Sequence, residues 1–374
     1  MYSRKTHNRL YEIDLFRFIA ACMIVLFHYA FRGMAADGMS IMNYPPLEGA
    51  AKYGYLGVHL FFIISGFVIL MTASQGSARQ FIISRTVRLY PAFWVCCTMS
   101  ALVMALAGNQ QNYQVTAGQY LLNMTMAAKF LGIPSIDDVY WSLYVEIQFY
   151  LLVCIVLALG MIRHAERLLG IWLAAVLVVS RWEVPYLSLL AMPEYAHYFI
   201  AGSMFYISYT SGFTAYRICI LGVCYVLALW GGVSQASALV SHYRVPFDVF
   251  IVSAVITSFF VIFSLVSLRY TRLISTPRWL VLGAITYPLY LIHQNVGYTI
   301  FNHLFPKVGR HMVMWGTVIG MMFFAYAVNT LIEKRFADGL KLLLGRLLGV
   351  EAARPVLSAG SDQAMPHPGE EPLS

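Results

Sequence analysis

The sequence predicts an all-α polytopic membrane protein, a bundle of about ten transmembrane helices. Composition is the first reason, because 60% of the 374 residues are hydrophobic and only 11% are charged. A soluble domain carries about 45–50% apolar and about 25% charged residues, so a soluble chain of this length could not cover its cores with charge. The second reason is that apolar runs long enough to cross about 30 Å of hydrocarbon recur along the chain. The same composition excludes a disordered, collagen-like, coiled-coil or disulfide-rich protein.

The apolar runs give the predicted helices in chain order. Two of them, at about 168–182 and 218–233, are short, and they can span the bilayer if their flanking residues snorkel. The others have the full length of a membrane span. They lie at about 13–31, 54–73, 91–108, 141–162, 196–212, 247–268, 279–300 and 311–332.

The positions of Lys and Arg predict the topology. An even number of crossings puts both termini on one side, and the flanks and tail on that side hold most of the 25 Lys and Arg residues. The positive-inside rule therefore predicts that both termini are cytoplasmic. The rule also accounts for the formal net charge of +8, so we expect the lipid bilayer, and no nucleic acid, as a partner.

We expect one membrane-embedded domain, residues 10–335, without a soluble domain at either end. Its first apolar run contains Asp14 and Arg17 and lacks a small-residue cleavage site, so we do not interpret it as a signal peptide. Residues 336–350 have the pattern of an amphipathic helix that lies on the inner membrane face. Residues 351–374 are rich in Pro, Ser, Gly and Glu and are predicted to be disordered.

Ionisable side chains within the apolar runs are functional candidates, because they are costly in a membrane unless they are paired or hydrated. They are Arg17, His28, His59, Glu146 and His293. At about 1.5 Å per residue, the three histidines and Glu146 come out at one level, about 21–24 Å from the inner face. Arg17 is nearer the inside. It shares a helix face with His28, about 16 Å away along the axis.

Each of these residues can also be explained by a structural role alone. Arg17 can snorkel to the cytoplasmic headgroups. His28 and His59 can be interface histidines, and His293 can be a hydrogen-bonded core residue. Glu146 is hardest to explain in this way, because a buried carboxylate needs a partner. His and Glu are zinc ligands, but here they are scattered over four runs without H-E-x-x-H spacing, so we expect no metal.

A second cluster, Arg85 and Arg88, lies just before the run at 91–108. We expect both at the start of that helix, where two arginines three residues apart share a face. The helix N-terminus would add free N–H groups and partial positive charge, which predicts a cytoplasmic anion site suited to phosphate. The alternative is an ordinary positively charged flank. Pro91 would be a normal helix-start residue.

Six short segments carry a family resemblance. They are Asp14-Leu-Phe-Arg17 followed by His28; Gly57-Val-His-Leu-Phe-Phe-Ile-Ile-Ser65-Gly66-Phe67; Phe81-Ile-Ile-Ser-Arg85-Thr-Val-Arg88-Leu-Tyr-Pro91; Trp141-Ser142-Leu-Tyr-Val-Glu146-Ile-Gln-Phe-Tyr150; Tyr287-Pro-Leu-Tyr290-Leu-Ile-His293; and Ile332-Glu333-Lys334. In this order, over about residues 10–335, they resemble the acyltransferase-3 family of integral membrane O-acyltransferases. That family includes rhizobial Nod-factor and exopolysaccharide acetylases and O-antigen acetylases.

The resemblance implies roles for particular residues. Arg17 and His28 match the family's Arg-x10-His, in which the histidine is catalytic. Arg85 and Arg88 match its R-x-x-R, which is associated with the acyl-CoA donor. Glu146 matches the acidic residue of its W-S-L-x-x-E segment, and we place it with His28 and Arg17 in the catalytic set.

The chain departs from the family pattern at two positions. It has His59 where the family often has Asp, and Ile147 where the family often has a second Glu. We therefore leave His59 out of the catalytic set, and the roles of His59 and His293 stay open. A fused extracytoplasmic domain, which some members carry, is absent from the sequence given, as in the stand-alone group.

From these observations we predict a multi-pass O-acyltransferase of the bacterial inner membrane. Acetyl-CoA or another short acyl-CoA, bound from the cytoplasm, would be the donor, and a hydroxyl of a cell-envelope or exported glycan would be the acceptor. Such a transfer needs a base, for which imidazole has a suitable pKa. One alternative is a glycolipid or polysaccharide transporter or flippase, although no internal repeat supports an inverted-repeat transporter. The other alternative is a non-catalytic scaffold.

Overall fold

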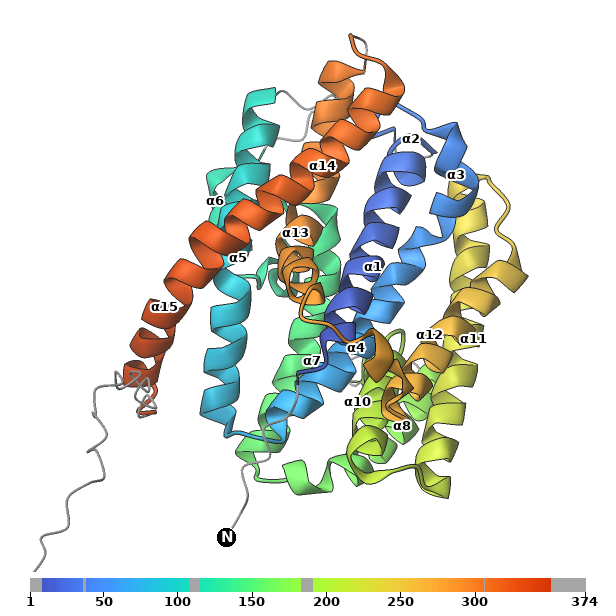
Figure 1. Ribbon diagram of the computed structural model, residues 1–374, viewed down its shortest axis with the longest axis vertical. Helices are drawn as coiled ribbons and strands as arrows, with labels where there is room; N and C mark the ends of the chain where they lie inside the picture. The colour runs from blue at the N-terminus through green and yellow to red at the C-terminus, as the bar shows by residue number, and fades with distance from the viewer. Residues whose placement is uncertain (1–8, 36–37, 108–114, 183–190, 306, 351–374) are drawn as a thin grey trace, which may run out of the picture.

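The computed structural model describes residues 9–35, 38–107, 115–182, 191–305 and 307–350, and within these ranges it contains helices and no strands. The long helices pack side by side (Figure 1), which confirms the predicted all-α class. The long helices are α1 Tyr11–Phe27, α4 Gly57–Ala73, α5 Ala78–Ala107, α7 Trp141–Ala158, α8 Ala165–Trp182, α10 Ala196–Ser211, α11 Ala215–Tyr243, α12 Val249–Ser267, α13 Trp279–Leu304, α14 Arg310–Val328 and α15 Lys334–Leu347. The short ones are α2 Gly33–Ala35, α3 Pro45–Ala51 and α6 Ala117–Asn123.

The outer surface has the character of a membrane protein. In the described part of the chain, 7 helices are long and apolar enough to cross a membrane. Each predicted run coincides with a long helix, but α8, α10 and α13 are not among the 7, so the count of ten stays a prediction. Large apolar side chains such as Phe250 and Leu273 are exposed, which is unfavourable in water and indicates contact with lipid.

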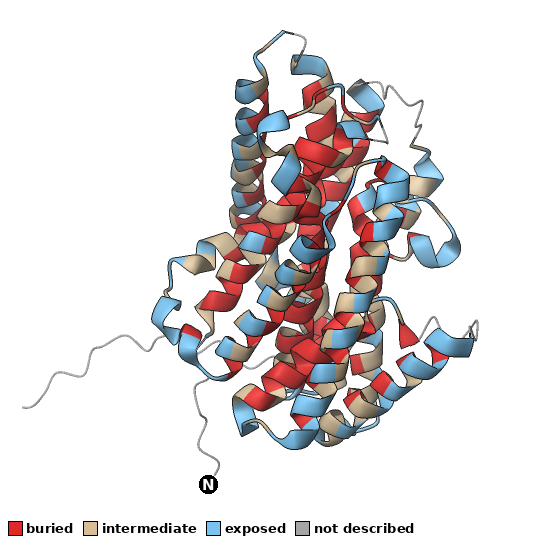
Figure 2. Ribbon diagram, turned by 90° about the vertical axis from the view of Figure 1, so that its right-hand side faces the viewer, coloured by how far each residue is buried: buried red, intermediate tan, exposed pale blue. Residues whose placement is uncertain are grey.

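The buried core follows α1, α4, α10 and α13, and Figure 2 shows buried residues running through the middle of the molecule. Glycines allow these helices to approach closely. A Cβ on Gly202 of α10 would collide with the carbonyl oxygen of Ile63 on α4. A Cβ on Gly283 of α13 would collide with the carboxylate of Asp14 on α1. Small residues at such crossings bring backbones together, as in other membrane bundles.

Helix α5 begins earlier than the sequence predicted. We expected its start near Pro91, with Arg85 and Arg88 at the N-terminus, but it starts at Ala78. The apolar run marks only part of the helix, because the more polar turns before it are also helical and bury side chains such as Phe81. The two arginines therefore lie about two or more turns inside the helix, beyond its free N–H groups. The predicted contribution of the helix terminus to the anion site is thus wrong.

Two π-helical turns interrupt the regular helices of the described chain. The first, His28–Arg32, follows α1, and the second, Asn329–Glu333, joins α14 to α15. Such turns are rare and often lie at functional sites. The first contains two residues of the histidine cluster described below, and the second contains Glu333, which lies beside Arg88.

The segment before α7 folds into the bundle. The carboxylate of Asp137 is fully buried and accepts a hydrogen bond from the backbone N–H of Asn295 on α13 at 3.1 Å. The side chain of Asn295 donates to the carbonyl oxygen of Ile136 at 2.9 Å. These bonds fix the 3₁₀ turn Asp138–Tyr140 and the first residue of α7 against α13. The start of α7 is therefore fixed inside the bundle by contacts with α13.

The C-terminal part of the described chain continues from the second π turn as α15, so most of the predicted amphipathic segment 336–350 is helical. In Figure 1, α15 runs beside α5, and it ends toward the same lower side of the molecule on which α1 begins. Its position relative to the bilayer, like the cytoplasmic side of both termini, stays a prediction. Residues 351–374 lie outside the described residues.

Candidate active site

A cavity of about 110 Å³ lies where α1, α4, α5, α7 and α13 meet. Arg17, Arg85, Arg88 and Glu146 are among the side chains that line it, and we call it the arginine cavity. They come from three different helices, α1, α5 and α7. The structure thus unites residues that the sequence placed in two separate clusters.

Glu146 is held in this cavity by two hydroxyl groups. Its Oε1 accepts hydrogen bonds from Ser65 Oγ at 2.7 Å and from the Tyr150 hydroxyl at 2.6 Å. Ser65 lies on α4 and Tyr150 lies one turn further along α7, so the carboxylate is fixed from two sides. Arg17 lines the same cavity, and its Nη1 lies 3.7 Å from Asp14 Oδ1 on its own helix. The partners of this half-buried carboxylate are therefore hydroxyl groups in an arginine-rich cavity.

The two arginines of α5 have different partners. Arg88 Nη1 lies 3.7 Å from Glu333 Oε2 on the second π turn. Arg85 Nη2 donates to Ser84 Oγ at 3.0 Å, and its buried Nε has no hydrogen-bond partner among the described residues. The lining of the arginine cavity therefore contains three guanidinium groups and one carboxylate, that of Glu146. The guanidinium groups have N–H donors that remain available to bind an anion.

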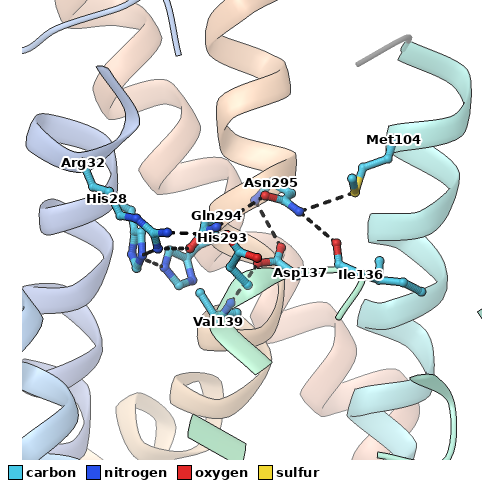
Figure 3. A network of polar contacts seen from close by, with 10 residues as sticks. His28, Arg32, Met104, Ile136, Asp137, Val139, His293, Gln294 and Asn295 are labelled. Carbon is cyan, nitrogen blue, oxygen red and sulfur yellow. Dashed lines mark hydrogen bonds and ion pairs between the residues drawn. The ribbon is translucent and has the colours of Figure 1, made fainter. Parts of the chain in front are cut away.

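His28 belongs to a second polar cluster, shown in Figure 3. Its Nδ1 lies 2.9 Å from the carbonyl oxygen of Ile24 and 3.0 Å from Nε2 of His293. Its Nε2 lies 3.3 Å from Nη1 of Arg32. Both histidines are buried, and His28 is not among the described residues that line the arginine cavity.

These contacts determine the tautomers of the two neutral histidines. A carbonyl oxygen can only accept, so His293 carries its proton on Nδ1, which donates to the carbonyl of Tyr290 at 2.8 Å. Nε2 of His293 is then an acceptor, and His28 shares its Nδ1 proton between this nitrogen and the carbonyl of Ile24. Nε2 of His28 keeps its lone pair, which accepts from Arg32. A lone pair on that nitrogen is what a general base requires.

Arg32 is held beside His28 by side chains from two other segments. Its Nη1 donates to Gln294 Oε1 at 3.2 Å, and its Nη2 lies 3.4 Å from Asp138 Oδ2. The neighbouring Asp137 is a buried carboxyl whose pKa burial raises from 3.8 to about 7. Asp137 therefore anchors the segment that supplies Asp138, and this segment positions Arg32.

Tyr290 joins the arginine cavity to the histidine pair. It lines the cavity, and its hydroxyl shares a hydrogen bond of 2.7 Å with Ser142, which lines the cavity as well. Its backbone carbonyl accepts the hydrogen bond from His293 three residues later on α13. The cavity wall thus lies about one helical turn from the imidazole that contacts His28.

The four side chains that we expected at one level divide into three groups. His28 and His293 meet, whereas Glu146 lies with Arg17, and His59 lines a different cavity. The depth count fails for Glu146, because Glu146 shares a cavity with Arg17 and not with His28. Helix α7 begins at Trp141, where its apolar run begins, but the segment before it is held against α13 inside the bundle.

Sequence reasoning missed Arg32, Gln294 and Asp138. The first two had a local signal, because Arg32 lies four residues after His28 on one helix face and Gln294 follows His293 directly. Asp138 had none, since only the folded segment before α7 brings it to Arg32.

In the part of the chain that the structure describes, the histidine pair has no further side chains beside it that would complete a metal site. No group of three or more His, Cys, Asp or Glu side chains there could hold a metal ion. A hydrogen bond joins the two facing ring nitrogens of His28 and His293 instead. The expectation that the protein needs no metal stays a prediction.

Comparison with known proteins gives two matches. A family model described as "Acyltransferase domain" matches residues 10–333. Among curated proteins, "Nodulation protein 10" of Rhizobium leguminosarum bv. viciae is 27% identical over 217 residues, which are 49% of this chain and 56% of that protein. The chain thus matches little more than half the length of this relative. No solved structure matches the chain.

Proposed function

Because the chain belongs to the acyltransferase-3 family, we propose that it is a membrane O-acyltransferase that uses acyl-CoA from the cytoplasm. The transferred group is acetyl or another short acyl chain, and the acceptor is a hydroxyl of a cell-envelope or exported glycan. The membrane is the bacterial inner membrane. One observation carries the proposal: Tyr290 connects a cavity lined by three arginines to a buried histidine whose Nε2 is free of a proton.

We assign the arginine cavity to the phosphate-bearing part of CoA. Guanidinium groups bind phosphate through paired N–H donors. Arg85 has a buried Nε without a partner, and Arg88 needs only to exchange Glu333 for a phosphate oxygen. The thioester end of the donor then extends past Tyr290 toward His28.

The chemistry of the transfer follows from the tautomer of His28. The acceptor hydroxyl replaces Arg32 Nη1 at the lone pair of Nε2. Nε2 then takes the hydroxyl proton while the hydroxyl oxygen attacks the thioester carbonyl carbon. The tetrahedral oxyanion collapses, the C–S bond breaks, and the CoA thiolate leaves. The imidazolium then returns its proton to the thiolate. Nε2 of His293 accepts from the Nδ1–H of His28 throughout, and so orients the base as a carboxylate does in a Ser-His-Asp triad.

We place Glu146 and Arg17 with the donor. Among the described residues, Glu146 accepts hydrogen bonds from Ser65 and Tyr150, and none joins it to His28. A carboxylate among three guanidinium groups offsets their mutual repulsion and keeps them oriented around the cavity. Glu146 therefore shapes the donor site and does not orient the imidazole.

The glycan acceptor is supported by the family and by the predicted topology. The matching curated protein is called a nodulation protein, and the motifs resemble a family that acetylates exported glycans. His28 lies toward the end of α1 that we predict to face away from the cytoplasm. An acceptor hydroxyl can reach that end from the outer side while the donor enters from the inner side.

Purified protein in lipid nanodiscs tests the proposal. The assay supplies radiolabelled acetyl-CoA and lipid-linked oligosaccharide extracted from the source bacterium. We expect acetyl label on the oligosaccharide with an equal release of CoA thiol. The alternative is a transporter or flippase for glycolipid. Oligosaccharide that crosses a liposome membrane without any consumption of acetyl-CoA would favour that alternative and overturn the proposal.

A further inference from the structure

His59 has no part in the proposed transfer, but it lines a second cavity of about 440 Å³. This cavity lies between α4, α8, α10 and α11, and the turn before α10 completes its wall. It shares no lining residue with the arginine cavity in the described chain. We call it the His59 cavity.

The inner wall of the His59 cavity holds two buried imidazoles. His59 and His197 are each 3% exposed. The ring of His59 stacks on Tyr198 with centroids 4.6 Å apart, and its Nδ1 lies 3.2 Å from the Tyr198 hydroxyl. His197 is less well satisfied, because the backbone carbonyl of Pro193 lies beside its ring, but neither ring nitrogen makes a well-formed hydrogen bond to a described residue. A buried polar group without a partner is unfavourable, so His197 indicates a ligand that supplies one.

The outer edge of the cavity is open at the side of α11. Trp230 is 67% exposed and lines the cavity, and Glu194 in the turn before α10 is exposed as well. Helix α11 is a candidate membrane span that is buried over only 22% of its apolar window, so this edge faces lipid. Tryptophan is typical of the membrane interface, where one face is apolar and the other is wet.

The lining indicates an uncharged, hydroxyl-rich ligand. It contains imidazole, amide and hydroxyl groups, including Gln235 and Ser234, and one carboxylate, Glu194. Among the described lining residues there is no Lys or Arg, which disfavours phosphate or carboxylate ligands. A sugar ring has hydroxyl groups that both donate and accept, and it has an apolar C–H face that packs on aromatic rings such as those of Tyr195 and Trp230.

We propose that the His59 cavity binds a sugar ring of the membrane-borne acceptor glycan. This inference rests on the proposed function and extends it with a second binding site for the acceptor. Tyr55 separates the two sites, because its ring lies 5.9 Å from that of Phe27, next to His28, and 6.3 Å from that of His59. The bound ring is therefore a different sugar unit from the one that reacts at His28. The cavity raises acceptor affinity without a part in the chemical step.

Two variants test this assignment. His197→Phe keeps a planar ring and removes two buried nitrogens that make no well-formed hydrogen bond, so it should not weaken folding. Gln235→Leu removes the α11 amide that hydrogen-bonds to His59 in the cavity wall. His303→Phe is the matched control, since His303 is exposed near the end of α13 and does not line the cavity.

The first measurement is equilibrium binding of tritium-labelled oligosaccharide to purified protein, both as the lipid-linked form and after release from the lipid. We expect both forms to bind wild-type protein, and we expect Kd to rise about tenfold in each cavity variant, as for a lost hydrogen-bonded contact. Unchanged Kd in both variants, or an equal rise in His303→Phe, would overturn the assignment. So would binding of the lipid-linked form alone, or displacement of the sugar by vesicles of choline-headgroup lipid.

The second measurement is acetyl transfer from radiolabelled acetyl-CoA. The cavity variants should raise the KM for the oligosaccharide and leave kcat and the KM for acetyl-CoA unchanged. A rise in the KM for acetyl-CoA would contradict the inference. If wild-type protein binds the sugar, and His197→Phe weakens this binding, but no acetyl is transferred, the proposed function fails while the sugar site stands.

Discussion

The imidazoles of His28 and His293 meet edge to face, with Nδ1 of His28 3.0 Å from Nε2 of His293 and ring centroids 4.9 Å apart. His293 is itself oriented by the carbonyl of Tyr290 on its own helix. The tautomer of His28 is therefore set by a second histidine, without a carboxylate. The sequence left His293 open as a core residue, and this geometry makes it a positioning residue for the proposed base.

His28→Ala should reduce acetyl transfer by about 10²–10⁴-fold, because it removes the general base. Transfer from radiolabelled acetyl-CoA is measured at equal protein level in membranes. The control is His303→Ala, which removes an exposed imidazole from α13. If His28→Ala retains nearly wild-type transfer, the mechanism is incorrect and His293 becomes the next candidate.

His293→Leu should lower kcat about 10–100-fold, because the imidazolium of His28 loses an acceptor for its Nδ1 proton. His293→Gln should retain more activity, since its side-chain oxygen can accept the same proton. Steady-state kinetics with both substrates are the measurement, and neither KM should change greatly. Equal losses of kcat in the two variants would argue against an acceptor role for His293.

Replacing Arg85 and Arg88 together with Ala should raise the KM for acetyl-CoA at least about tenfold, because hydrogen bonds to charged groups are lost. Lysines at both positions should restore affinity only in part, since Lys lacks the paired donors of a guanidinium group. Arg79→Ala is the matched control: Arg79 lies at the start of the same helix and donates to the carbonyl of Leu348. An unchanged KM in the double variant would remove these arginines from the donor site.

Glu146→Gln should reduce turnover about tenfold without reducing the amount of protein, because its oxygen can still accept from Ser65 and Tyr150 but its charge is lost. Glu146→Ala should reduce turnover further, since the hydroxyl groups of Ser65 and Tyr150 then lose their acceptor. The pH dependence of kcat should stay the same in Glu146→Gln, because Glu146 does not contact His28. A shifted pH profile would show that the carboxylate acts on the base after all.

Asp137 should make stability depend on pH, because burial raises its pKa from 3.8 to about 7. A raised carboxyl pKa means that the folded state binds the proton more tightly than the unfolded state. The contribution of Asp137 to stability is therefore largest below about pH 4 and declines as pH rises toward 7. Asp137→Asn keeps an acceptor for the N–H of Asn295 and has no such dependence.

Thermal unfolding in detergent at pH 5 and pH 8 measures this effect. We expect the change in Tm between the two pH values to be smaller for Asp137→Asn than for the wild-type protein. Asp138→Asn is the control on the neighbouring exposed carboxylate. An identical change in Tm in Asp137→Asn and the wild-type protein would show that Asp137 is ionised in the folded state at both pH values.

The sequence by itself determined the class of this protein and the identity of its exceptional residues. Apolar runs and charge content depend on how each residue partitions between lipid and water, and this is a local property. For that reason Arg17, His28, Glu146 and His293 could be singled out without a structure. The motif order likewise indicated the family that the comparison with known proteins then matched.

Only the tertiary structure decided which of these residues meet. Glu146 lies with Arg17, and His28 lies with His293, because these contacts depend on how the helices pack and not on how far each residue lies along its apolar run. Distant contacts set this packing, such as the bond between Asp137 and Asn295 that holds the start of α7 against α13. The close crossing of α13 and α1 depends in the same way on packing between helices that are far apart in the sequence. No local pattern carries these relations, since the partners are joined only after the helices pack.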